Sequence, residues 1–338
     1  MPPFVSIIVP CYNEQATIRT LLEAIHAQTY PRPRLEVVIA DGMSGDGTRA
    51  EIAAFSQAHR GLSIRVVDNP KRIIPAALNQ ALAASGGEII VRLDGHSIPY
   101  PDYVERCVAD LETGLGENVG GMWEIRPSES TWMAAAIAAA AAHPLGVGDA
   151  LYRHPGRAAA VDTVPFGAFK RELLALVGFF DENLLTNEDY EFNARVRESG
   201  GKVWLDPSIR SIYLARPTLD ALASQYARYG FWKWRMLRRY PGTVRWRQAL
   251  PPLLVASLVV GAGLALFFPF FRILLAVEVV GYAIAVALAG IETAVRQKKA
   301  ALGIGLPLAI ATMHISWGAG FLWSMIKGIF PAGAATRQ

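Results

Sequence analysis

The chain has 338 residues, of which 52% are hydrophobic and 18% charged, and its mean hydropathy is +0.25. This composition is too apolar for a disordered protein or an ordinary soluble domain, and it indicates membrane association. The formal net charge is +4, and two cysteines, Cys11 and Cys107, exclude a disulfide framework or a cysteine-rich zinc site. No secretory signal is visible at the N-terminus, so we expect the N-terminal part to stay in the reducing cytoplasm.

Strand and helix patterns alternate through residues 1–115. Short β-branched runs predict four strands, at residues 5–10, 35–42, 64–70 and 88–95. Apolar side chains three or four residues apart predict helices between them, with Asp46 capping the second helix and Pro75 in the first turn of the third. This alternation is typical of an α/β fold with a largely parallel sheet and helices on both faces.

The ends of these strands carry acids and amides. Ligands of such sheets bind beyond the carboxyl ends of the strands, which selects residues 10–14, 41–48, 68–71 and 94–96. The absence of a glycine-rich motif disfavours a dinucleotide oxidoreductase, and the sequence has neither a P-loop nor an H-E-x-x-H zinc motif. Carboxylates at several strand ends suit a nucleotide whose phosphates carry a divalent cation.

Several motifs resemble family 2 glycosyltransferases. VSIIVPCYNE, ADGMSGDGT and VRLDGHS match the donor half, TNEDYEFNARVRESGGKVW resembles the acidic ED motif, and QYARYGFWK resembles the Q-x-x-R-W element with Tyr229 in place of tryptophan. The resemblance covers roughly residues 4–235 and is strongest to bacterial exopolysaccharide glucosyltransferases, which similarly have a D-x-H variant and a C-terminal membrane segment. It implies the GT-A fold of nucleotide-diphospho-sugar transferases, with a Rossmann-like mixed sheet.

The resemblance identifies the donor side. It implies that Asp41 meets the uracil or ribose of a nucleotide sugar, although an Asx-turn with Ser44 explains this residue without a ligand. The donor-binding candidates are Pro10, Tyr12, Glu14, Asp41, Lys71, Asp94 and Gly95.

The metal candidates are Asp94 and His96, because Asp94-Gly95-His96 stands where the family has D-x-D. The charge of a diphosphate leaving group is neutralised by Mg²⁺ or Mn²⁺, so the resemblance makes Asp94 a metal or donor ligand. His96 departs from the motif, and an imidazole suits Mn²⁺ better than Mg²⁺. The alternatives for His96 are a phosphate contact, an acceptor contact, or packing in a turn.

Glu188 and Asp189 form the acidic pair, and the resemblance makes Asp189 the general base. An inverting transfer needs one carboxylate that takes a proton from the acceptor hydroxyl, without a glycosyl-enzyme intermediate. We expect Thr186 or Asn187 to cap a helix with both acids in its first turn, where the helix dipole favours them. Such a role at the helix end, without catalysis, is the alternative for both acids.

The acceptor-side candidates come later in the chain. Gln225, Arg228 and Tyr229 lie on a helix predicted before the membrane, and a spacing of three puts Gln225 and Arg228 on one face. Arg228 would stabilise the departing diphosphate, and Tyr229 or Trp232 would stack on a sugar. Trp232 fits an interfacial aromatic belt equally well. Gly167 lies in a run that resembles the acceptor-side loop.

Three apolar segments follow a break in composition near residue 248, at 249–271, 273–291 and 300–326. Each is long enough to cross a bilayer core, which needs about 20 apolar residues. Lysine and arginine before the first segment and between the second and third place both regions in the cytoplasm, which leaves the C-terminus with Lys327 and Arg337 outside. Glycines and Pro307 also allow a kinked or partly re-entrant third segment.

These patterns define the expected domains and function. We expect a cytoplasmic GT-A domain at 1–240, with a donor half at 1–115 and an acceptor and catalytic half at 116–240, followed by a membrane region at 241–338. The expected reaction is an inverting, metal-dependent transfer of a hexose, glucose from UDP-glucose, onto a lipid-linked oligosaccharide of the polyprenyl diphosphate type. It would serve exopolysaccharide or cell-surface glycan synthesis at the cytoplasmic face of a bacterial inner membrane.

Two alternatives share this donor site. A polyprenyl-phosphate sugar synthase would use a lipid phosphate as acceptor, whereas the Gln225–Tyr229 element favours a sugar hydroxyl. A membrane-anchored nucleotide-sugar binding or assembly protein would lack catalysis, and Asp94 and Asp189 argue against it. No nucleic-acid partner is expected, and the sequence leaves the oligomeric state open.

Overall fold

The computed structural model describes residues 1–153, 156–241 and 245–329, and the chain divides into two compact units. The first unit is Met1–Glu124 with His154–Tyr213, and the second is Ile125–Arg153 with Leu214–Gln338. This division differs from the boundary expected at residue 240. The Ala-rich segment and the helix after Tyr213 both pack against the last helix of the chain, which groups them with the C-terminal region.

Among the described residues, nine strands form one mixed sheet, which is the centre of the first unit. The strand order is β3-β2-β1-β4-β8-β6-β9-β5, with β7 paired to β9. The strands are β1 Val5–Cys11, β2 Leu35–Asp41, β3 Ser63–Asp68, β4 Ile89–Arg92, β5 Ile98–Pro99, β6 Asn118–Pro127, β7 Ala159–Ala160, β8 Ala168–Lys170 and β9 Val203–Ala215. β1 to β4 run parallel, which confirms the four predicted strands. β8 then joins β4 and β6 in antiparallel fashion.

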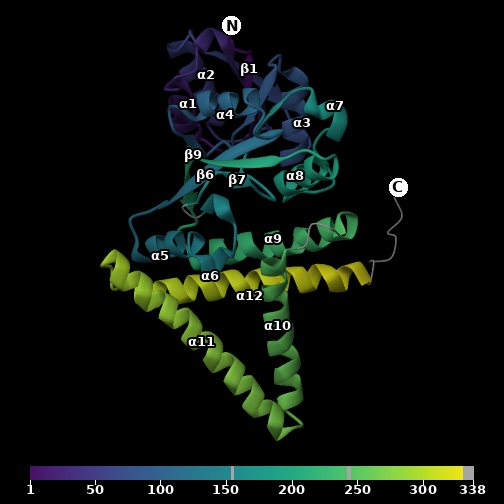
Figure 1. Cartoon of the computed structure of the whole chain (residues 1–338). Helices are drawn as coiled ribbons and strands as arrows, with labels where there is room; N and C mark the ends of the chain where they lie inside the picture. The colour runs from purple at the N-terminus through teal and green to yellow at the C-terminus, as the bar shows by residue number, and fades with distance from the viewer. Residues whose placement is uncertain (154–155, 242–244, 330–338) are drawn as a thin grey trace. The chain divides into compact units, whose positions relative to one another are not determined.

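Helices cover both faces of this sheet (Figure 1). They are α1 Ile18–His26, α2 Thr48–Ala58, α3 Ile74–Ala84, α4 Tyr103–Glu112, α7 Leu173–Val177 and α8 Glu188–Glu198, with 3-10 turns at Arg32–Arg34 and Leu151–Arg153. One face buries Ile7 with Leu21 of α1, Phe55 of α2 and Val104 of α4. α3 packs on β1 and β2 from the other face, as alternation of side chains along a strand requires.

The expected helix starts are partly confirmed. Pro75 lies in the first turn of α3. Asp46 accepts a hydrogen bond from the Thr48 backbone N–H at 3.0 Å, but Gly47 occupies the N-cap position of α2. Asp46 therefore stabilises this helix start from one position earlier than expected.

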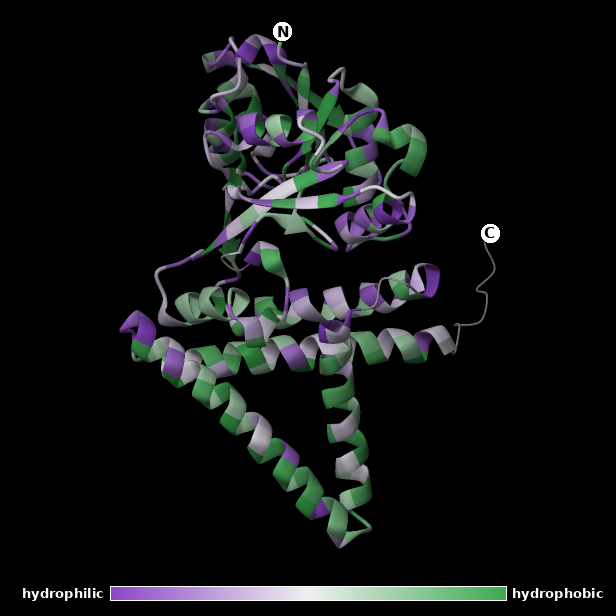
Figure 2. Cartoon of the chain, viewed as in Figure 1, coloured by the Kyte–Doolittle hydropathy of each residue, from purple (hydrophilic) through white to green (hydrophobic). Residues whose placement is uncertain are grey.

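The second unit is helical. Its helices are α5 Trp132–Ala141, α6 Pro144–Val147, α9 Leu219–Arg239, α10 Trp246–Ala265, α11 Pro269–Gln297 and α12 Leu302–Ile329. α12 lies along α9, and α10 and α11 meet at their connecting loop (Figure 1). Within the described residues, three helices are long and apolar enough to cross a membrane: Trp246–Ala265, Pro269–Gln297 and Leu302–Gly328. Figure 2 shows the apolar character of α10 and α11 along their length.

The three expected spans coincide with α10, α11 and α12, although α10 begins and ends a few residues earlier than expected. Only the length and the composition of these helices identify them as candidate membrane spans. Their path through a bilayer therefore stays a prediction. Arg337, expected on the outer side, lies beyond the residues that the structure describes.

Candidate active site

The ends of β2 and β3 are joined by Arg49, a residue that sequence reasoning missed. Asp41 is fully buried, and its carboxylate accepts hydrogen bonds from the Ser44 backbone N–H at 3.0 Å and from Ser44 Oγ at 2.5 Å. Arg49 Nε lies 2.6 Å from Asp41 Oδ2, and Arg49 Nη2 lies 2.5 Å from Asp68 Oδ1. The Asx-type turn considered from the sequence is therefore formed, and a nucleotide contact by Asp41 stays a prediction.

The segment after β1 approaches the end of β2 closely. Pro10 is buried within β1, whereas Tyr12 beyond it is 47% exposed. A Cβ at Gly42 would lie 2.9 Å from the Tyr12 ring, so the absence of a side chain at this position lets the ring lie against the loop. Tyr12 is thus presented at the carboxyl ends of the strands, as a donor-binding aromatic would be.

Cys11 precedes this segment and is a buried thiol. Burial raises the pKa of Cys11 to about 12, and the negative charges of Asp41 and Glu14 add to the effect. A thiol that stays protonated at neutral pH is a poor nucleophile. The environment of Cys11 therefore favours packing over nucleophilic chemistry.

Glu14 and His96 form a pair across the site. Glu14 Oε1 lies 2.9 Å from His96 Nδ1, and the Thr17 hydroxyl also donates to Glu14. Burial would raise the pKa of Glu14, but the hydrogen bond and charge of His96 and the bond from Thr17 outweigh it, so the pKa is lowered. Gly95 lies beside the pair, because a Cβ there would be 3.0 Å from Glu14 Cγ.

Arg92 gathers three carboxylates at the end of β4. Its side chain is 2% exposed, and Nη2 lies 2.7 Å from Glu188 Oε1 and 3.1 Å from Asp94 Oδ1. Nη1 forms an ion pair with Asp189 Oδ1. Burial opposes the charged form of Arg92, but the charges of Asp94 and Glu188 outweigh it and raise the pKa of Arg92. The donor motif and the ED motif therefore meet on one buried guanidinium.

Arg92 was not among the site residues predicted from the sequence, although it lies in the VRLDGHS motif. The signal was present, because a charged residue inside an apolar strand must be paired when it is buried. Its partners could not be read from the strand, since Glu188 lies 96 residues farther along the chain.

The acidic pair lies where the sequence placed it, in the first turn of α8. Asn187 occupies the N-cap position with φ 69°, and its side chain makes no capping hydrogen bond. Asn187 thus occupies the expected N-cap position, but the expected hydrogen bond from a side-chain cap is not formed. A left-handed backbone at this position does not direct the side chain toward the N–H groups of the first turn. The Glu188 side chain is 8% exposed and the Asp189 side chain 27%, so Asp189 is the more accessible of the two acids.

Gly167 lies beside Arg92. Its carbonyl accepts a hydrogen bond from the Arg92 backbone N–H at 3.0 Å, and its φ is 86°. A Cβ at this position would also lie 2.7 Å from Asn118 Oδ1. Glycine is thus required at this position by both conformation and space.

Lys71 contacts the segment before α8. Its Nζ lies 2.5 Å from Glu182 Oε2, and Asn79 Nδ2 donates to Glu182 Oε1 at 3.1 Å. The Lys71 side chain is 66% exposed. It therefore lies at the rim of the strand ends rather than in their core.

The Q-x-x-R-Y element belongs to the second unit. On α9, Gln225 is buried and its Nε2 donates to Tyr229 Oη at 2.9 Å, while Arg228 is exposed. Trp232 lies 4.9 Å beneath the Arg235 guanidinium. Since the other candidates belong to the first unit, the roles of Gln225, Arg228, Tyr229 and Trp232 in the reaction stay predictions.

The donor set for a metal is small. Among the described residues, no group of three His, Cys, Asp or Glu side chains could hold a metal ion. Asp94 is a partly exposed carboxylate at a strand end, which fits a cation that takes its remaining ligands from substrate phosphates and water. His96 Nδ1 lies within hydrogen-bond distance of Glu14, and a metal or phosphate contact by His96 stays a prediction.

Comparisons with known proteins agree with this geometry. A model of glycosyl transferase family 2 matches residues 6–177. Succinoglycan biosynthesis protein ExoA of Rhizobium meliloti is 34% identical over 319 residues, which is 93% of this chain and 93% of the relative. The dolichyl N-acetyl-alpha-D-glucosaminyl phosphate 3-beta-D-2,3-diacetamido-2,3-dideoxy-beta-D-glucuronosyltransferase of Methanococcus voltae is 26% identical, over 96% of this chain and 98% of the relative.

One solved structure shares the fold along most of the chain. A mannosyltransferase from Pyrobaculum calidifontis, in complex with GDP-Man and Mn²⁺, has a TM-score of 0.62 at 23% identity and covers 98% of this chain and 88% of its own. This likeness confirms the GT-A-like fold that the sequence motifs implied.

Proposed function

This chain belongs to glycosyl transferase family 2, and from that premise we propose that it transfers a hexose from a nucleotide sugar to a lipid-linked oligosaccharide, with inversion. The observation that carries the proposal is the Arg92 cluster, in which Asp94 of the donor motif shares one guanidinium with Glu188 and Asp189. Donor phosphates held by Asp94 would then lie beside the partly exposed carboxylate of Asp189.

The donor would bind at the carboxyl ends of β1 to β4. Tyr12 and Asp41 lie there for the base and ribose, and Asp94 would hold Mg²⁺ or Mn²⁺ against the diphosphate. When bound, the cation neutralises charge that develops on the leaving diphosphate. His96, whose Nδ1 lies 2.9 Å from Glu14 Oε1, would contact the same cation or the phosphates.

Asp189 would act as the base. The acceptor hydroxyl oxygen attacks the anomeric carbon while the bond from that carbon to the diphosphate oxygen breaks, and the hydroxyl proton passes to Asp189. Arg92 holds the Asp189 carboxylate in place during this step. A single displacement inverts the anomeric centre, so an α-linked donor gives a β-linked product. Arg228 would stabilise the departing diphosphate, with Gln225 and Tyr229 on the acceptor side.

The names of the relatives support the acceptor class. The Methanococcus relative is named for a dolichyl phosphate-linked sugar acceptor and a β-linked product, and the Rhizobium relative for succinoglycan biosynthesis. A lipid-linked acceptor suits a chain with apolar helices long enough for a membrane. Basic residues between Lys233 and Arg247 would attract anionic headgroups. We place the reaction at the cytoplasmic face of a bacterial inner membrane, in exopolysaccharide or surface-glycan synthesis.

The test begins with the donor. Purified protein in detergent is screened for hydrolysis of UDP- and GDP-sugars with Mg²⁺ or Mn²⁺, and UDP-glucose is the first donor to be tried. The radiolabelled form of the best donor is then incubated with membrane lipid extract. Label in a lipid-linked oligosaccharide supports the proposal. Label in a lipid-monophosphate sugar would make the chain a polyprenyl-phosphate sugar synthase, and donor binding without transfer would contradict an enzymatic role.

A further inference from the structure

The helix α9 cannot lie in hydrocarbon, because it carries too many charges. Its basic residues are Arg228, Lys233, Arg235, Arg238 and Arg239. A charged side chain at the centre of a bilayer opposes insertion strongly, and α9 carries several of them. A helix that packs along the whole length of α9 must therefore lie at the same depth in the membrane as α9, outside the hydrocarbon core.

The second half of α12 packs along α9 through glycine contacts. A Cβ at Gly230 would overlap the Trp317 carbonyl oxygen, and one at Gly320 would overlap the Ala227 carbonyl oxygen. Trp234 and Phe321 lie edge to face with their ring centroids 5.4 Å apart. Backbones in such close contact leave no space for lipid, so this half of α12 shares the level of α9.

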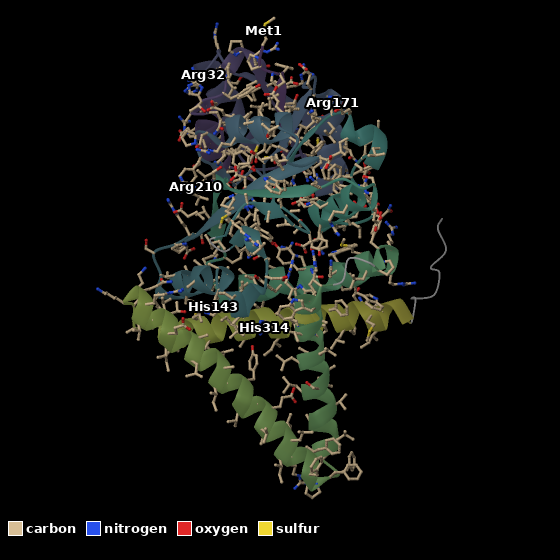
Figure 3. The ribbon with its side chains drawn as sticks, in the orientation of Figure 1. Met1, Arg32, His143, Arg171, Arg210 and His314 are labelled. Atoms are coloured by element: carbon tan, nitrogen blue, oxygen red, sulfur yellow. The ribbon has the colours of Figure 1, made fainter. Side chains whose placement is uncertain are left out.

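The first half of α12 packs on α5 and α6. A Cβ at Gly305 would lie 2.5 Å from Ala136 Cβ of α5. His314, labelled on α12 in Figure 3, has its Nε2 2.9 Å from the Leu145 carbonyl oxygen of α6. α5 has ten residues, which is too short to cross a bilayer. Both halves of α12 therefore contact helices that do not span.

α10 and α11 meet α12 near their ends. Pro251 at the start of α10 faces Gly318, and Gly290 near the end of α11 faces Pro307. Pro252 is the buried residue of α10, and those of α11 are Val286, Ala289, Gly290 and Thr293. α11 has 29 residues, or about 43 Å, so its last turns extend beyond a hydrocarbon core of about 30 Å. Those are the turns that α12 covers.

Exposed apolar side chains distinguish α12 from the other two helices. The exposed apolar residues of α12 are Ile304, Leu308, Ile315, Trp323 and Ile326. The spacings of four, seven and eleven residues between the four aliphatic ones return to one face, and Trp323 lies to the side of that face. The opposite face buries Leu306, Ile310 and Met313. The exposed apolar residues of α10 surround that helix and include Leu250, Leu253, Val259 and Val260. A single apolar stripe is typical of a helix that lies in the membrane interface. A helix that spans the membrane typically has apolar side chains all around it.

We propose that α10 and α11 form a two-helix membrane hairpin, and that α12 lies in the headgroup region of the bilayer along α9. Both ends of the hairpin and residue 328 then lie on the same side of the membrane as α9, instead of the three-span path expected from the sequence. Lys298, Lys299 and Lys327 at the two ends of α12 are placed for anionic headgroups. The glycines of α12 serve helix packing, and the helix is continuous through Pro307.

Cysteine labelling tests the topology. Single cysteines replace Phe267 in the hairpin loop, Lys299 before α12 and Lys327 near its end, in a background without Cys11 and Cys107. In intact spheroplasts, a membrane-impermeant maleimide is expected to label Phe267→Cys alone, and inverted vesicles to expose Lys299→Cys and Lys327→Cys. Labelling of Lys327→Cys with Phe267→Cys in spheroplasts would overturn the proposal, because α12 would then span. The readout needs no donor, so it is independent of the proposed reaction.

Depth measurement provides a second test that requires only the folded chain in liposomes. Nitroxide labels are placed at Leu308, Ile315 and Ile326 of α12, with Val260 of α10 as the matched position in a span. The surface arrangement predicts the same shallow depth for the three α12 labels, from the ratio of oxygen to nickel-chelate accessibility, and a deep Val260. If the label at Ile315 were the deepest of the three and as deep as the label at Val260, the surface arrangement of α12 would be contradicted.

Discussion

At the scale of single residues, Arg92 determines how acids from two motifs share one corner of the fold. A planar guanidinium presents several donors in a fixed geometry, so it can serve three carboxylates at once, which a lysine ammonium does less well. Within this cluster the side chains of Arg92 and Glu188 are buried, whereas those of Asp94 and Asp189 are partly exposed. Its open acids are the two to which we assign chemistry.

Removal of the Arg92 charge is expected to destabilise the first unit. Arg92→Met would leave Glu188 buried without its partner, and loss of one member of a buried pair typically weakens folding by about 3–5 kcal/mol. Thermal unfolding followed by intrinsic fluorescence measures the effect. The double variant Arg92→Met/Glu188→Gln should recover part of the loss, and equal melting temperatures for the single variant and the wild type would contradict the cluster's role.

Asp94 is expected to link metal to donor binding. Asp94→Ala should abolish transfer and weaken UDP binding chiefly when Mg²⁺ or Mn²⁺ is present, because Asp94 would supply a carboxylate ligand to the cation that neutralises the diphosphate. Calorimetric titration of UDP with and without metal measures this linkage, and Glu112→Gln on the exposed side of α4 provides a control. If the metal dependence of UDP binding were unchanged in Asp94→Ala, Asp94 would not be the ligand.

Asp110 of α4 is expected to make stability depend on pH. Burial, together with the charge of Asp206, raises the pKa of Asp110 from 3.8 to about 6, and among the described residues its buried Oδ2 has no hydrogen-bond partner. The folded state therefore binds a proton more tightly than the unfolded state, so this contribution to stability is present below pH 4 and is lost as the pH rises through 6.

Asp110→Asn removes that loss. Its melting temperature should exceed that of the wild type at about pH 8, and the difference should shrink as the pH is lowered toward about 4. Glu112→Gln, on the exposed side of the same helix, is the control and should shift little. A pH-independent difference would assign the effect to packing rather than to charge.

At the scale of elements, glycines decide which helices can touch. Gly230 and Gly320 let the backbones of α9 and α12 meet, and Gly290 does the same for α11 and the first turns of α12. A Cβ at Gly263 of α10, by contrast, would meet no atom of the described residues within 4 Å, so this glycine has no such function there. Close backbone contact between small residues is a common basis of helix association in membrane proteins.

Gly320→Leu should therefore separate α9 from α12. Overpacking at a tight contact typically destabilises by about 1–3 kcal/mol, and more where backbone is the obstacle. The measurement is the melting temperature in detergent, with Gly263→Leu as the matched control that should remain near the wild type. Equal melting temperatures for the two variants would mean that the contact between α9 and α12 contributes nothing to stability.

At the scale of the whole chain, local patterns predicted what depends on local physics. The four parallel strands, the acids at their ends and the position of Glu188 and Asp189 in a first helical turn follow from side-chain periodicity and motif spacing. The partners of Arg92 and Arg49 did not follow, because ion pairs join residues far apart in the chain. Hydropathy likewise indicated the length of α12 but not its neighbours, since an average over a window does not depend on which face of the helix each apolar residue occupies.

The most direct test of the proposed reaction is single-turnover transfer by Asp189→Asn. With saturating sugar nucleotide chosen from the donor screen and a lipid-linked acceptor, transfer should fall by about 10²–10⁴-fold, the usual contribution of a positioned base. Donor affinity should barely change, because asparagine keeps the size and polarity of the side chain, and NMR of the wild-type product should show a β linkage from an α-linked donor. Near-normal transfer by Asp189→Asn, or a product that retains the α configuration, would contradict the single-displacement mechanism.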